Sequence, residues 1–231
     1  MNDTITIYYF FTDPLISKEI IAEEPYNVNQ KYAKSSKNNL MLCPAFRDYF
    51  SNTFSVKSPY DYSFKVEEDG LIQSKDYDQH FFNNVIQIRN TERNLVSFMM
   101  APLFIFPSES VEMSQIHPSM GSGDLSKKTN LVPATFNPFL HQRPLECAYW
   151  LNYNNYNIKL DDDLYYIKFH TNKKIKFQRI GYNKEILDII SSFQDHKDFT
   201  KKIWKLYDWY GLRKKQNSTK RILNIIKEKC L

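Results

Sequence analysis

Two histidines and a carboxylate in the middle of the chain could together bind a transition metal. His117 and Asp124 enclose a short loop, and His141 follows later in the same segment. Two imidazoles and one carboxylate that leave coordination positions open are the ligand set of non-haem iron oxygenases. His117, His141 and Asp124, with Glu112 as a second possible carboxylate, are therefore candidate ligands of Fe(II). The spacing departs from the His-x-Asp pair usual in those enzymes. The alternative is a rigid loop in which His117 hydrogen-bonds to a nearby carbonyl.

The segment that carries these residues, about 101–144, is rich in residues that shape the backbone. It contains six of the ten prolines and two of the five glycines of the chain. Proline fixes φ and glycine permits positive φ, so polar groups can be held there without a helix. Gly121-Ser122-Gly123 could cradle a phosphate, with Lys127-Lys128 nearby. It lacks a complete phosphate-binding motif and a helix pattern after it, which favours a plain turn.

The second candidate site is the basic end of the chain. Residues 184–231 contain twelve lysines and arginines against six acidic residues, whereas residues 1–183 contain 19 against 20. Aromatic rings are interleaved with these cations. The candidate binding residues are Lys201, Lys202, Lys205, Trp209, Arg213, Lys214 and Lys215. They could contact a protein partner or another copy in an assembly, they could bind nucleic acid through phosphates and stacked bases, or they could be a solvated helix face.

Composition excludes several classes of protein. Cys43, Cys147 and Cys230 are odd in number and far apart, which argues against a disulfide framework and favours a reducing, intracellular setting. No apolar stretch is long enough to span a bilayer, and the N-terminus has no secretory signal, so we expect no membrane association. No complete catalytic motif is present, and whether the protein is an enzyme stays open.

The residue pattern predicts strands first and helices afterwards. Strands are expected at Thr4–Phe11, Thr53–Lys57, Tyr60–Val66, Phe81–Arg89, Leu95–Met100, Leu103–Phe106, Val111–Ile116, Leu145–Leu151, Tyr156–Leu160, Leu164–Phe169 and Lys174–Ile180. The last two are expected to form a hairpin, and the second and third a hairpin or a bend. Asp161–Asp163 is expected to be an acidic turn before that last pair.

From Asn183 the apolar spacing becomes helical, with Gly211 as an expected helix stop and Ser218 or Thr219 as the cap of a last helix. The fold class predicted is a β-rich α+β protein, in which an antiparallel sandwich or jelly-roll-like barrel precedes a C-terminal helical subdomain. The expected division is a β domain at 1–182 and a basic amphipathic helical subdomain at 183–231.

Several phrases of the chain resemble uncharacterised proteins of T4-like phages of marine bacteria. They are Leu42–Phe46, Ser58–Asp61, Ile116–Asp124, Arg143–Glu146 and Leu164–Ile167. The resemblance implies a viral protein, located in the cytoplasm of the host bacterium or in the virion, and it carries no active residues. The function expected is non-catalytic binding or assembly through the basic helical end. The alternative is the metal-dependent enzyme described above.

Overall fold

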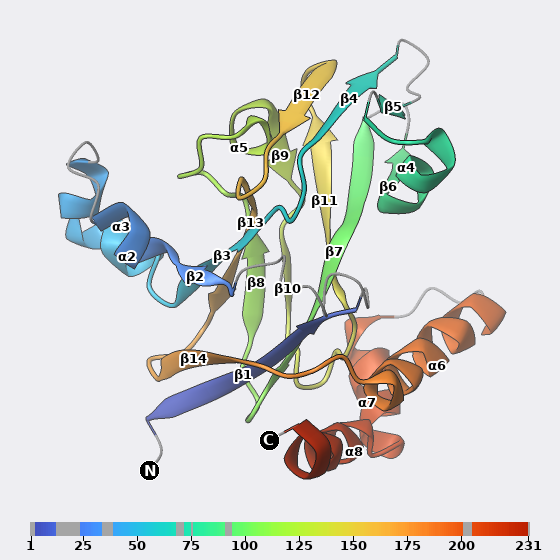
Figure 1. Ribbon diagram of the computed structural model, residues 1–231. Helices are drawn as coiled ribbons and strands as arrows, with labels where there is room; N and C mark the ends of the chain where they lie inside the picture. The colour runs from blue at the N-terminus through green and yellow to red at the C-terminus, as the bar shows by residue number, and fades with distance from the viewer. Residues whose placement is uncertain are drawn as a thin grey trace.

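Alternating burial along the strands builds a β-sandwich that is followed by helices, which confirms the predicted fold class (Figure 1). The computed structural model describes residues 3–12, 24–33, 39–67, 72–74, 76–90, 94–200 and 205–230. The strands are β1 (Thr4–Phe11), β2 (Tyr26–Asn27), β3 (Thr53–Lys57), β4 (Tyr62–Val66), β5 (Ile72–Ser74), β6 (Ile86–Asn90), β7 (Leu95–Pro107), β8 (Met113–Ile116), β9 (Thr129–Leu131), β10 (Ala134–Phe136), β11 (Leu145–Leu151), β12 (Asn155–Ile158), β13 (Asp163–Phe169) and β14 (Lys174–Arg179). The helical segments are α2 (Val28–Ala33), η1 (Asn39–Leu42), α3 (Pro44–Tyr49), α4 (Gln79–Val85), α5 (Asp124–Lys128), α6 (Lys184–Thr200), α7 (Leu206–Lys215), α8 (Ser218–Ile225) and η2 (Ile226–Cys230).

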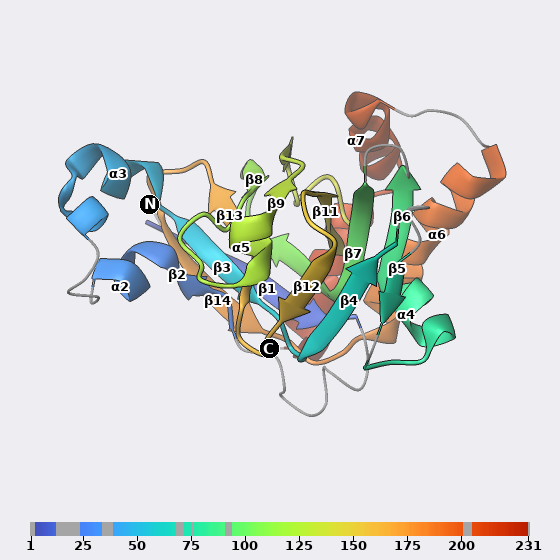
Figure 2. The same cartoon turned by 90° about the horizontal axis from the view of Figure 1, so that it is seen from above.

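The described strands form three sheets, which make up the sandwich. The six-stranded sheet has the order β14-β1-β7-β11-β9, with β6 also paired to β7. The five-stranded sheet has the order β10-β8-β13-β3-β2, and the three-stranded sheet has the order β12-β4-β5. All pairings are antiparallel except that between β1 and β14, which is parallel. Figure 2 shows the layers from above.

The two-residue period of a strand places alternate side chains in different cores. In β1, Ile7 and Tyr9 enter the core between the sheets, whereas Phe10 enters a second core on the outer face of the six-stranded sheet. In the five-stranded sheet, Tyr165 enters the central core, whereas Tyr166 enters a third, small core beneath α2 and α3.

The helical end is attached to the sandwich by the second core. Phe104 of β7 packs there with Ile186 of α6 and Ile222 of α8, and all three side chains are fully buried. Asn183 caps α6, since its Oδ1 accepts a hydrogen bond from the N–H of Ile186 at 3.1 Å. Among the described helices, none has both the length and the apolar character to cross a bilayer.

The predicted hairpin of the last two strands is wrong, although both strands exist. β13 pairs with β3 and β8, whereas β14 lies in the other sheet beside β1. The connecting loop crosses the sandwich edge, where the side-chain amide of Asn52 donates to the carbonyls of Thr171 and Lys173 at 2.7 and 3.0 Å. Phe169 and Phe177 still meet, with ring centroids 6.2 Å apart, but they meet across the sandwich. Likewise, β3 and β4 join at a bend and belong to different sheets.

Other element predictions needed correction. The N-cap of α8 is Asn217, so Ser218 and Thr219 lie inside the helix instead of capping it. The run Phe81–Arg89 is the end of α4 followed by β6. The two strands expected on either side of Pro102 are one strand, β7, and its register with β11 shifts opposite this proline. A bulge tolerates a residue without an N–H. Gly211 does not stop α7, which continues to Lys215. The last turn of the helix, beyond the glycine, is held by the buried Arg213 side chain, which donates to the carbonyl of Gln142.

Candidate functional site

His117 lies at the end of β8 and is part of the loop's own hydrogen-bonding. Its Nε2 is 3.0 Å from the carbonyl oxygen of Ser126, and its Nδ1 accepts from the N–H of Leu131 at 3.4 Å. These contacts correspond to the tautomer with the proton on Nε2. The imidazole therefore connects the loop to β9. This agrees with the alternative given above, a rigid loop in which His117 hydrogen-bonds to a nearby carbonyl.

The glycines of the loop permit a close approach to the turn before β13. A Cβ atom added at Gly121 would lie 3.2 Å from Oδ2 of Asp163, and one at Gly123 would lie 2.6 Å from Cγ of Asp162. A Cβ at Gly121 would also lie 2.4 Å from Oγ of Ser126, so at both positions a residue other than glycine requires a neighbour to shift. Because the loop faces carboxylates, these glycines serve packing rather than a phosphate site.

Asp124 and His141 have separate surroundings. Asp124 Oδ2 accepts from Lys128 Nζ and from the N–H of Asn157, each at 2.8 Å. The His141 ring packs edge-on against Phe136 and Trp209, with centroid distances of 5.2 and 6.2 Å. Within the described ranges, no three His, Cys, Asp or Glu side chains are grouped so that they could hold a metal ion. The structure thus does not bring His117, His141 and Asp124 together as ligands of Fe(II).

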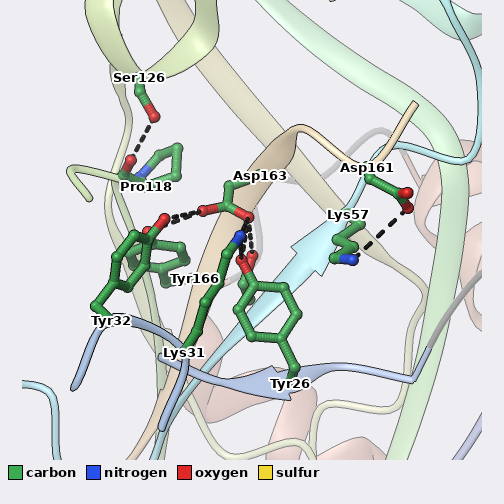
Figure 3. A network of polar contacts seen from close by, with 10 residues as sticks. Tyr26, Lys31, Tyr32, Lys57, Pro118, Ser126, Asp161, Asp163 and Tyr166 are labelled. Carbon is green, nitrogen blue, oxygen red and sulfur yellow. Dashed lines mark hydrogen bonds and ion pairs between the residues drawn. The ribbon is translucent and has the colours of Figure 1, made fainter. Parts of the chain in front are cut away.

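A polar network that the sequence pattern did not reveal surrounds Asp163 (Figure 3). The Asp163 side chain is 1% exposed. Its Oδ1 accepts from the hydroxyls of Tyr26 and, at 2.9 Å, Ser55. Its Oδ2 accepts from the hydroxyls of Tyr32 and Tyr166, each at 3.0 Å. Four hydroxyl donors satisfy a buried carboxylate, so the network is a structural tie between α2, β2 and the five-stranded sheet.

Lys31 adds a positive charge at the edge of this network. Its Nζ lies 3.6 Å from Asp163 Oδ1 and donates to the Tyr26 hydroxyl at 2.6 Å. The same ammonium lies over the rings of Tyr26 and Tyr32, at 4.5 and 5.3 Å from their centroids. The only local signal for the network in the sequence is Asp163 itself, an acidic residue next to the apolar run that begins at Leu164, and the pattern there predicts a turn.

We expect the stability of the protein to fall steeply in alkaline solution. Burial, together with the negative charge of Asp163, raises the pKa of Tyr32 to about 12 from 10.0. Burial and Asp163 also raise the pKa values of Tyr26 and Tyr166. The folded state thus favours neutral phenols, and this stabilisation is complete below pH 10 and is lost as the pH rises through about 12. Urea unfolding at pH 9, 11 and 12 measures it.

The Tyr32→Phe variant should show a flatter decline of the urea midpoint over this pH range than the wild type. Tyr153→Phe, which changes a tyrosine that is 56% exposed, should follow the wild type. Parallel declines in all three proteins would contradict the assignment of the pH dependence to the Asp163 network.

At the basic end the structure separates a buried arginine from exposed lysines. Lys201 and Lys202 lie outside the described residues. Arg213 is only 3% exposed, and its Nη2 donates to the carbonyl of Gln142 at 2.7 Å. Its guanidinium lies 5.8 Å from the Trp209 ring, and burial lowers its pKa to about 9. Arg213 therefore holds α7 against the 137–143 loop rather than facing a partner.

The exposed face of α7 is the candidate contact site. Tyr207, Gly211 and Lys214 follow one another at helical spacing and lie on one face, with Lys215 beside them. Tyr207 is 83% exposed, and a Cβ atom added at Gly211 would meet nothing within 4 Å. Lys205, at the N-cap, is also exposed, whereas Trp209 is half-buried against His141. The result is an open aromatic and basic surface.

Comparisons of the chain with protein-family models, with curated proteins and with solved structures found no match.

Proposed function

We propose that this is a phage-type protein that acts by binding or assembly, with the exposed face of α7 as its contact surface. The partner is a protein surface that carries acidic side chains, on another protein or on a second copy of this chain. The setting that fits is the cytoplasm of a bacterial host or the virion.

The observation that carries the proposal is the unpaired positive charge of the segment that contains Tyr207. Residues 205–230 contain eight lysines and arginines against two acidic residues. Within the part of the chain that the structure describes, Lys214, Lys215 and Lys220 take part in no ion pair. An exposed aromatic ring on the same helix face as unpaired lysines is typical of a contact whose centre is aromatic and whose rim is polar.

A charge reversal tests the proposal. Lys214→Glu together with Lys215→Glu should abolish binding to poly-glutamate, measured by fluorescence anisotropy at low salt, and any self-association seen by sedimentation velocity. The matched control is Lys127→Glu with Lys159→Glu, because these lysines are exposed and lie outside the helical end. We expect the control to behave as the wild type.

Two outcomes would overturn the proposal. One is equal loss of binding in the control and test variants, which would indicate a response to net charge alone. The other is preferential binding of a single-stranded oligonucleotide through the same lysines, which would make nucleic acid the partner. Binding to an acidic protein and binding to nucleic acid should both weaken as the salt concentration rises, so salt dependence alone does not distinguish the two partners.

A further inference from the structure

A cavity of about 200 Å³ opens at the sandwich edge between β10 and β11, apart from the exposed face of α7. Residues around it include Gln115, Phe136, His141, Arg143, Leu145 and Glu146. Its floor is closed by Leu145, which is 4% exposed, and by Gln115, which is 5% exposed. Pockets for drug-sized ligands measure about 300 to 1,000 Å³, so this one suits a smaller molecule.

The charged residues of the cavity wall are Arg143 and Glu146, and Arg89 reaches the same carboxylate from outside the lining. Arg143 Nη2 lies 2.9 Å from Oε1 of Glu146, and Arg89 Nη2 lies 3.5 Å from Oε2 of the same carboxylate. Two guanidinium groups therefore share one carboxylate. A guanidinium has five N–H donors, and Glu146 is the only ion-pair partner of Arg143 among the described residues. Arg143 can thus still bind a carboxylate supplied by a ligand.

Gln115 adds a hydrogen-bond acceptor. Its Nε2 donates to the carbonyl of Glu146 at 3.0 Å, which assigns the orientation of the amide. In the described part of the chain, its Oε1 accepts no hydrogen bond. Gln115 as a residue is 5% exposed, but its Oε1 is not fully buried, so this oxygen can accept a hydrogen bond from a ligand that carries an O–H or N–H group.

The remaining wall is apolar and aromatic. Phe136 and His141 meet with their rings tilted by 65°, and Ala134, Pro144 and Ala148 complete this side. The Trp209 ring of α7 lies edge-on to the His141 ring, with centroids 6.2 Å apart.

We propose that this cavity binds a small aromatic carboxylate that also carries a hydrogen-bond donor. The carboxylate pairs with Arg143, the ring packs against Phe136, and the donor meets Oε1 of Gln115. This site is independent of the contact surface proposed for α7.

The probe is 4-hydroxybenzoate, with binding measured by isothermal titration calorimetry. We expect it to bind more tightly than benzoate, which lacks the donor, and than phenol, which lacks the carboxylate. Arg143→Ala should weaken binding at least about tenfold, because a charge-assisted pair is lost. Gln115→Leu should remove the preference for 4-hydroxybenzoate over benzoate.

Arg47→Ala is the matched control, since it removes an exposed arginine far from the cavity in sequence. The milder Arg143→Lys variant, which keeps the charge, should show an intermediate affinity if Arg143→Ala proves unstable. No binding of any probe at millimolar concentration, or equal affinity in the Arg143 and Arg47 variants, would overturn the proposal. The α7 charge-reversal variant should keep its affinity for the probe, so failure here and failure of the α7 proposal are distinguishable.

Discussion

Replacing Asp163 with asparagine should lower the free energy of unfolding by about 2–4 kcal/mol. The carboxylate accepts four hydroxyl hydrogen bonds, and two of the donors, Ser55 and Tyr166, are fully buried. Each oxygen receives two of these bonds. In asparagine an NH₂ group takes the place of one of these oxygens. It cannot accept the two hydroxyl hydrogen bonds made there, and the negative charge opposite Lys31 is also lost. Urea unfolding followed by fluorescence gives the change.

Asp161→Asn is the control, because it makes the same chemical change two residues away. The Asp161 side chain is 52% exposed and pairs with Lys57 at 3.7 Å. A surface pair contributes about 0–1 kcal/mol, and asparagine tolerates the positive φ of 68° at this position. Equal destabilisation by the two variants would show that the buried network is not a special source of stability.

Replacing Phe104 with alanine should cost about 3–5 kcal/mol. Phe104 is fully buried, and its ring centroid lies 5.1 Å from that of Phe10 in the core that joins the six-stranded sheet to α6 and α8. Because that core contains side chains from both the sheet and the helices, we expect the wild type to unfold in one transition. Urea unfolding followed by far-UV and near-UV circular dichroism tests both points.

Tyr207→Ala is the comparison for this variant. It removes an aromatic ring of similar size that is 83% exposed, so stability should change by no more than about 0.5 kcal/mol. A cost of Phe104→Ala as small as that of Tyr207→Ala would contradict the role of this core in attaching the helices.

Most of the longer strands could be predicted from local pattern, whereas strand pairing could not. β1 and β11 lie where the alternation of Thr4–Phe11 and Leu145–Leu151 places them. The alternation of β13 and β14 is as clear, yet these strands are in different sheets. An alternating strand buries one face equally well against a hairpin partner or across a sandwich, so the pattern does not distinguish the two.

Of the candidate site residues, the exposed lysines could be predicted from the sequence, whereas the buried residues could not. The exposed lysines of α7 follow from charge and helical spacing, which are local. Arg213 has the same local signals, and only the packing of α7 against the 137–143 loop buries it. The Asp163 network joins residues more than a hundred positions apart, such as Tyr26 and Asp163, and no local pattern marks such a pair.

The sequence by itself determined a β-rich fold, the change to helices at Asn183 and the basic charge of the C-terminal end, because these depend on composition and on periods of two and 3.6 residues. It did not decide between a sandwich and a barrel. Only the tertiary structure decided that His117 connects a loop to β9, that the loop glycines allow contact with Asp162 and Asp163, and that Arg143, Gln115 and Phe136 share a cavity. Those features depend on which strands become neighbours, and that choice is made by burial across the sandwich.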